Sequence, residues 1–203
     1  LNFNAEAYCA PSRSALMTGR YPPRTNFSPL SASEITIAEL LSGVGYATAI
    51  FGKWHLGDKP GFFPTDRGFD EWYGIPNSAS TAARDSAFQF DSKLVRMDYV
   101  MESKRGQVPS EVKVFDIAAR RTLDSESINK STNFIKKNVK ANKPFFLFLP
   151  FTQTTAPTRP HPDFVGKTGN GDYADALAEL DYNSGKIFDT IKNLGIEDNT
   201  IVI

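Results

Sequence analysis

The sequence predicts an α/β fold, a largely parallel sheet flanked by helices. Two helix-then-buried-strand units support this prediction. A helical pattern over residues 36–43 precedes the apolar run 46–51, and a longer helix ending near residue 140 precedes the apolar run 145–149. Helices that alternate with buried strands favour parallel pairing with right-handed crossovers. The 203 residues, of which 40% are hydrophobic, suffice for one sizeable core, so we expect one domain or part of one.

Charge and cysteine content narrow the classes of function. Lys plus Arg and Asp plus Glu both number 23, so net charge gives no reason to expect nucleic acid or an acidic membrane as a partner. A single cysteine excludes an internal disulfide and leaves the redox compartment open. No apolar run approaches the roughly 18 residues that a membrane span needs. Any anion binding is therefore expected to be local.

The first helix is expected to begin at the only cysteine of the chain. Pro11 suits a first helical turn, and Gly19 suits a left-handed stop about two turns later. Cys9 then lies at or just before a helix N-terminus, where free backbone N–H groups and the helix dipole favour an anion. Arg13 adds a positive charge on the following turn. Spacing alone leaves two alternatives open, a nucleophile for an anionic substrate and a small buried thiol.

A second helix and a strand follow. Thr36 and Glu39 have the spacing of a capping box, and the apolar run 46–51 reads as a buried strand. Lys53 and His55 then lie at the C-terminal end of that strand, where open α/β sheets bind ligands. Because they are two residues apart, an extended backbone would project both side chains to one side. Alternatively, Lys53 is a solvated surface residue and His55 has only a structural role.

The rest of the chain is expected to complete the sheet. Residues 58–111 are rich in Gly, Pro and aromatic residues, and we expect a loop-rich insert with short irregular elements. A helical face over residues 128–139 precedes the run 145–149, which has the length of a central strand covered on both faces. A last helix over residues 171–194 carries an apolar stripe for packing, and residues 201–203 read as a final strand.

Several motifs resemble those of the type I sulfatases, the arylsulfatase-like branch of the alkaline phosphatase superfamily. The stretch 9–20, Cys-x-Pro-Ser-Arg followed by Leu-x-Thr-Gly-Arg, resembles the first sulfatase signature. The stretch 45–55, Gly-Tyr-x-Thr-x-x-x-Gly-Lys-x-His, resembles the second signature, and residues 64–74 resemble the segment that follows it. The resemblance implies an alkaline-phosphatase-like fold, incomplete here. We expect residues 1–203 to be an internal part of one sulfatase catalytic domain, truncated at both termini.

The resemblance also implies a chemistry. In the family, a formylglycine-generating enzyme oxidises the cysteine matched by Cys9 to Cα-formylglycine, whose hydrated aldehyde is the nucleophile. The family resemblance gives Arg13 and Lys53 the role of neutralising sulfate charge, and gives His55 a hydrogen bond to the formylglycine. The implied reaction is hydrolysis of a sulfate ester, on a small molecule or a sulfated sugar, with calcium as the metal. By the same analogy, such enzymes are secreted, periplasmic or lysosomal.

Two departures from the family pattern qualify these expectations. Thr155 stands where sulfatases usually carry a histidine that contacts sulfate and protonates the leaving oxygen, and a hydroxyl cannot supply such a proton near neutral pH. His161 is a candidate stand-in from a loop. The acidic and amide calcium ligands of the family find no match in the chain, which leaves the product of Cys9 as the one family metal ligand. We therefore expect this chain alone to bind calcium weakly or not at all and to show no appreciable turnover.

Two alternatives to a sulfatase remain open at this point. A non-catalytic relative that binds sulfate esters is favoured by Thr155. A phosphoester or phosphonate hydrolase of the same superfamily would use a similar anion site, although the Pro-Ser-Arg context favours a sulfatase.

Overall fold

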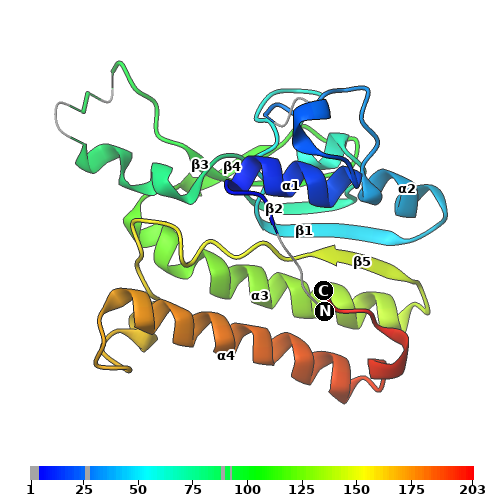
Figure 1. Cartoon of the computed structure of the whole chain (residues 1–203). Coiled ribbons are helices and arrows are strands. Elements are labelled where there is room, and N and C mark those ends of the chain that lie inside the picture. The colour runs from blue at the N-terminus through cyan, green and yellow to red at the C-terminus, as the bar shows by residue number, and fades with distance from the viewer. Residues whose placement is uncertain (1–4, 26–27, 88–89, 92) are drawn as a thin grey trace.

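The computed structural model describes residues 5–25, 28–87, 90–91 and 93–203, and Figure 1 shows their arrangement. The helices are α1 (Cys9–Thr18), α2 (Ile37–Gly43), α3 (Ile117–Lys140) and α4 (Asp172–Asn193), and the strands are β1 (Ala47–Lys53), β2 (Glu71–Ile75), β3 (Tyr99–Lys104), β4 (Ser110–Val114) and β5 (Phe145–Phe148). Short 3-10 turns lie between them. The expected α/β class, a sheet flanked by helices, is confirmed.

The five strands form one sheet in the order β4-β3-β2-β1-β5. β1 pairs in parallel with both β2 and β5, so the strand that precedes Lys53 lies inside the parallel part. β3 and β4 add antiparallel pairs at the far side of β2. The sheet is therefore mixed, and its parallel portion comprises β2, β1 and β5.

Helices cover both faces of the sheet (Figure 1). On one face, Phe51 and Tyr73 pack with Phe134 of α3, while α4 lies outside α3. On the opposite face, Ile50 and Met17 belong to a second core under α1 and α2. Alternate residues of β1 thus point into two different cores, which explains why all seven of its residues are buried.

The predicted ends of α1 and α2 are confirmed. Gly19 caps α1 in the left-handed conformation, with φ 67°, and its N–H donates to the carbonyl of Ala15. Thr36 and Glu39 form the full capping box of α2. Cys9 is the first helical residue of α1, and the residue before it, Tyr8, provides no side-chain cap. No side chain of a described residue therefore caps the N–H groups around Cys9.

The expectation of a loop-rich insert over residues 58–111 is wrong in its secondary structure. This stretch contains all of β2 and β3 and the start of β4, although residues 88, 89 and 92 lie outside the described part. Gly74 interrupts the apolar pattern of β2, and the second half of β3 is polar, with Glu102, Ser103 and Lys104 in succession. Gly74 lies within β2, and it is needed there because a Cβ atom would stand 1.8 Å from the carbonyl oxygen of Gly52 on β1.

The third helix and the strand after it also differ from expectation. α3 begins at Ile117, where the side chain of Asp116 accepts from the N–H of Ala119 as an N-cap. The run 145–149 was expected as a central strand. It forms β5, at the edge of the sheet built by the described residues, and its side chains are half-buried.

The end of the chain shows two further differences. α4 buries a mainly polar face that includes Asp175, Glu179 and Asn183, while Tyr173 and Phe188 of the expected apolar stripe are more than half exposed. Residues 201–203 form no strand and are exposed. Among the described residues, no helix is long and apolar enough to cross a membrane.

Candidate active site

The N-terminus of α1 meets the C-terminal end of β1. The Sγ atom of Cys9 lies 3.2 Å from the Nδ1 atom of His55, within hydrogen-bond distance. Cys9 is exposed, whereas His55 is half-buried. A reactive group at position 9 would therefore be open to solvent on one side and held by an imidazole on the other.

Two cationic side chains flank this pair. The guanidinium of Arg13, one turn along α1, donates to the backbone carbonyl of Lys53 and so ties α1 to the end of β1. The Lys53 side chain is 2% exposed, and its ammonium lies 3.4 Å from the hydroxyl of Ser78. The structure thus brings together the four residues that the signatures single out, Cys9, Arg13, Lys53 and His55.

The backbone at His55 is not the extended segment that the spacing suggested. His55 has φ 64°, in the left-handed region that non-glycine residues seldom adopt. Its N–H donates to the carbonyl of Pro76, and that of Trp54 donates to Ile75, so the chain leaves the sheet while still bonded to the end of β2. The left-handed turn places the imidazole beside Cys9. Strained backbone of this kind is common where a side chain must be aimed at a functional site.

The site is electrostatically prepared for an anion. Burial lowers the pKa of Lys53, and the neighbouring charge of Arg13 lowers it further. Burial lowers the pKa of Arg13 to about 10, opposed by Cys9, and it lowers the pKa of His55 to about 4 with the help of Lys53 and Arg13. No carboxylate is among the groups that shift these three pKa values. An anionic ligand would therefore supply the missing negative charge.

Thr155 and His161 are placed differently from these four residues. Thr155 lies beyond β5, where its carbonyl accepts from Arg120, and its hydroxyl makes no hydrogen bond to a described residue. His161 begins the turn over residues 162–164, where its Nδ1 accepts from the N–H of Asp163 and its own N–H donates to Glu179. None of these contacts involves the group around Cys9.

Arg120 and Asp124 of α3 are residues that the sequence analysis missed. Both side chains are fully buried. Arg120 donates to the carbonyls of Thr152, Thr155 and Pro157, and Asp124 accepts from the N–H groups of Thr152 and Gln153. The charge of Arg120 also acts on Lys53. This pair therefore holds the loop that carries Thr155 and joins it electrostatically to the anion site.

The close approach of loop and strand behind the site depends on glycine. A Cβ atom at Gly52 would stand 2.2 Å from the carbonyl oxygen of Pro150, and Gly52 has φ 130°. That carbonyl accepts from the N–H of Lys53 at 3.2 Å. The glycine before Lys53 thus lets the loop after β5 bond directly to the lysine backbone.

The described residues do not fit a calcium ion by themselves. No group of three or more His, Cys, Asp or Glu side chains within the described ranges lies close enough to hold a metal. Calcium takes six to eight oxygen ligands, and the immediate neighbours of Cys9 are the nitrogen-bearing groups of Arg13, Lys53 and His55.

Comparison with known proteins identifies the family. Residues 2–203 match the family model described as Sulfatase. The chain belongs to the sulfatase family. Curated sulfatases are similar over nearly the whole chain. N-acetylgalactosamine-6-sulfatase of Rattus norvegicus is 34% identical over 98% of this chain, and arylsulfatase A of Homo sapiens is 30% identical over 96% of it.

Solved sulfatase structures share the fold of this sulfatase chain. The crystal structure of the PsFucS1 sulfatase from Pseudoalteromonas sp. superposes with a TM-score of 0.84 at 27% identity, covering 94% of this chain and 43% of that one. The expected sulfatase fold is confirmed. The chain spans about 40% of the length of the curated relatives it matches.

Proposed function

We propose that this sulfatase chain carries the nucleophile and the anion-binding residues of a site that hydrolyses sulfate esters. The supporting observation is the meeting of Cys9, Arg13, Lys53 and His55 where α1 begins and β1 ends. A sulfate monoester carries its negative charge on small oxygen atoms, which buried cations without carboxylate partners can neutralise. The exposed position of Cys9 leaves room for the substrate to approach.

Each of the four residues has a distinct role in this proposal. Lys53 binds sulfate oxygens, because its ammonium is buried and has the hydroxyl of Ser78 rather than a carboxylate as its partner. Arg13 adds a second positive charge and fixes the backbone of Lys53 through its carbonyl. His55 orients the group at position 9. Because the pKa of His55 is lowered to about 4, its imidazole is neutral at pH 7 and can share a proton with that group.

The group at position 9 is proposed to be Cα-formylglycine, made from Cys9 by a formylglycine-generating enzyme. When hydrated, this aldehyde carries two hydroxyl groups. One hydroxyl is the nucleophile, and the second allows the aldehyde to re-form, which a thiol cannot do. The structure supports the proposal in that Cys9 is exposed at an uncapped helix N-terminus, where the helix dipole favours developing negative charge.

The proposed substrate class is a sulfated sugar or another small sulfate ester. Curated relatives at 30% identity or more are named for N-acetylgalactosamine 6-sulfate and for aryl sulfates. Calcium remains part of the proposal as a family cofactor, with ligands that the described residues do not supply.

The test uses a version of the protein extended to the length of the curated relatives, with matched aryl sulfate and aryl phosphate esters. We expect turnover of the sulfate ester and a fall in kcat/KM of about 10²- to 10³-fold in Lys53→Met, the loss typical of removing one charge-stabilising group. Lys59→Met, exposed six residues along, is the matched control. Preference for the phosphate ester would instead favour a phosphoester or phosphonate hydrolase. Robust turnover by the 203 residues alone would contradict the proposal that they form only part of the site.

A non-catalytic sulfate-binding role is the second candidate, and the observation that favours it is Thr155. The loop is held through backbone atoms by Arg120 and Asp124, so the threonine side chain is positioned without being able to act as an acid near neutral pH. Thr155→His in the extended version separates the two candidates. A strong rise in kcat with a poor leaving group would show that acid catalysis was missing.

A further inference from the structure

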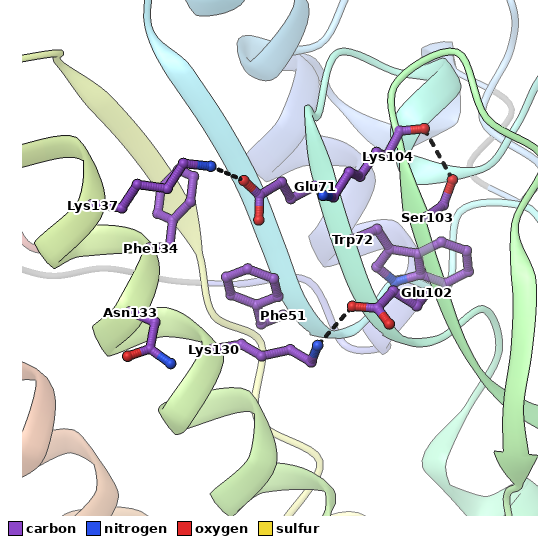
Figure 2. A pocket seen from close by; sticks show the side chains of 10 residues that line it. All are labelled: Phe51, Glu71, Trp72, Glu102, Ser103, Lys104, Lys130, Asn133, Phe134 and Lys137. Atoms are coloured by element: carbon purple, nitrogen blue, oxygen red, sulfur yellow. Dashed lines mark hydrogen bonds and ion pairs between the residues drawn. The ribbon is translucent and has the colours of Figure 1, made fainter. Parts of the chain in front are cut away.

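Two cavities lie away from the Cys9 site, and in the smaller one two of the three lining lysines are already paired with carboxylates. This cavity, of about 160 Å³, lies between α3 and the sheet (Figure 2). In Figure 2, the ammonium of Lys137 reaches Glu71 at 2.8 Å. The ammonium of Lys130 reaches Glu102 at 2.7 Å. Trp72 also lines this cavity, and its indole N–H has no partner among the described residues, but the ring belongs to the second core. Both carboxylates of this cavity are therefore engaged, and Lys104, the one lining lysine without an ion pair to a described residue, is exposed.

The second cavity is twice as large and differs in chemistry. Its volume is about 320 Å³, near the lower end of the roughly 300–1,000 Å³ typical of small-molecule sites. It lies between α3, α4 and the turn over residues 162–164. Its lining residues are Ser125, His161, Asp163, Phe164, Lys167, Glu179, Tyr182, Asn183 and Lys186.

Two residues that line this cavity carry buried polar atoms without partners among the described residues. Glu179 is 1% exposed and Asn183 is 2% exposed, and both line the cavity one turn apart on α4. The Oε1 atom of Glu179 and the Nδ2 atom of Asn183 have no hydrogen-bond partner among the described residues. Buried polar groups are nearly always hydrogen-bonded, to protein or to ordered water, so two unpartnered atoms one turn apart on α4 favour a bound polar group. A ligand hydroxyl, which both donates and accepts, matches this pair.

The mouth of the cavity is aromatic and positively charged. The rings of Phe164 and Tyr182 lie 5.4 Å apart. The ammonium of Lys167 stands 4.4 Å from the first ring and that of Lys186 stands 4.5 Å from the second. Neither lysine forms an ion pair with a described residue. The lining carboxylate of Asp163 lies instead beside His161, at 3.4 Å from Nδ1. Two unpaired ammonium groups favour an anionic group on the ligand.

We propose that this cavity binds a sugar unit that carries one anionic group, either sulfate or carboxylate. The sugar hydroxyls face Glu179 and Asn183, and the anionic group lies between Lys167 and Lys186. Phe164 and Tyr182 line the same cavity and give it apolar surface for the C–H groups of the ligand.

This binding site is separate from the site around Cys9, and binding there requires no hydrolysis at Cys9. Cys9, Arg13, Lys53 and His55 do not line the cavity. The cavity is joined to the loop that carries Thr155, because Glu179 accepts from the Nε2 atom of Gln153 in that loop.

The experiment measures the binding of galactose 6-sulfate, galacturonic acid and galactose to the 203-residue chain by NMR titration. We expect saturable binding of at least one of the two anionic sugars, about tenfold tighter than that of galactose. Lys167→Ala combined with Lys186→Ala should remove this tenfold preference. Lys192→Ala, an exposed lysine of α4 outside the cavity, is the control and should leave it unchanged.

Comparing the two anionic sugars shows which anionic group is recognised, and the Lys53→Met variant shows at which of the two sites the sugar binds. Binding of only one anionic sugar supports the proposal and identifies the group that is recognised. In Lys53→Met, the affinity should stay the same. The proposal is overturned if no anionic sugar binds, if the double variant binds as well as the control, or if Lys53→Met removes binding instead.

Discussion

Cys9 Sγ lies 3.2 Å from His55 Nδ1, although the two residues are 46 positions apart in the chain. One residue begins α1, and the other follows the end of β1 in a left-handed conformation. Arg13 reinforces this junction by donating to the carbonyl of Lys53. The candidate site therefore lies at the contact between the N-terminus of α1 and the C-terminal end of β1.

Replacing Lys53 should separate binding from stability. Lys53→Met removes a buried ammonium whose pKa is lowered by burial and by Arg13. We expect the affinity for inorganic sulfate to fall about tenfold or more, because a charge-assisted contact is lost. The free energy of unfolding should stay the same or rise by about 1 kcal/mol, since a charge without a carboxylate partner is no longer buried. Calorimetric titration and urea unfolding measure the two quantities. A large fall in the free energy of unfolding of Lys53→Met would contradict this prediction and would show that Lys53 has a structural role.

The stability of the chain should depend on the titration of Glu179. Burial raises the pKa of Glu179 from 4.5 to about 7. The folded state then keeps a proton that the unfolded state releases, so stability is lost as pH rises from about 4.5 to about 7. Glu179→Gln does not titrate, and its advantage over the native chain should grow across that range by at most about 1.4 kcal/mol per pH unit. Asp189→Asn, exposed on the same helix, is the control. Urea unfolding that shows a constant difference between pH 5 and 7 would contradict this prediction.

Two glycines should respond in opposite directions to alanine. At Gly74, a Cβ atom would stand 1.8 Å from the carbonyl oxygen of Gly52, and φ is 152°, so Gly74→Ala should cost more than about 2 kcal/mol. At Gly185, inside α4, a Cβ atom meets nothing within 4 Å, so Gly185→Ala should stabilise by about 0.5–1 kcal/mol. Thermal and urea unfolding test the pair. Equal changes in the free energy of unfolding at both positions would contradict the close approach of β1 and β2 at Gly74.

Arg120 is expected to be the main support of the loop after β5. Arg120→Met leaves three loop carbonyls unpaired and Asp124 buried without a neighbouring cation, so we expect a cost of about 3–5 kcal/mol. The amide protons of Thr152 and Gln153 should exchange faster. Arg121→Met is the control, since its side chain bonds one carbonyl, that of Pro160, and should cost about 1 kcal/mol. Similar losses in both variants, with unchanged exchange, would argue against this role.

Local signals predicted those elements whose ends are marked by particular residue types. Gly19 and the Thr36–Glu39 box fix helix ends through contacts within a few residues, and the apolar run of β1 is buried on both faces as expected. β2 was missed because Gly74 reads as an interruption. Gly74 is needed because β2 approaches Gly52 closely, and this contact involves a neighbouring strand that the local sequence does not reveal.

The candidate site was predicted through its motifs more than through its geometry. The signatures named Cys9, Arg13, Lys53 and His55, but the spacing suggested an extended backbone where His55 has φ 64°. Arg120 was missed because a charged residue on a long helix ordinarily faces solvent. Its spacing of four from Asp124 was the available signal, since the pair falls on the buried face of α3.

The central claim is that Cys9 is the precursor of the nucleophile of a sulfate ester site. Mass spectrometry of the peptide that contains Cys9 tests it most directly, after co-expression with a formylglycine-generating enzyme and with Cys9→Ala as the control. We expect a loss of roughly 18 Da, thiol to aldehyde, confined to that peptide and absent from the control. An unmodified thiol, in a sample where the same enzyme converts a known acceptor peptide, would contradict it.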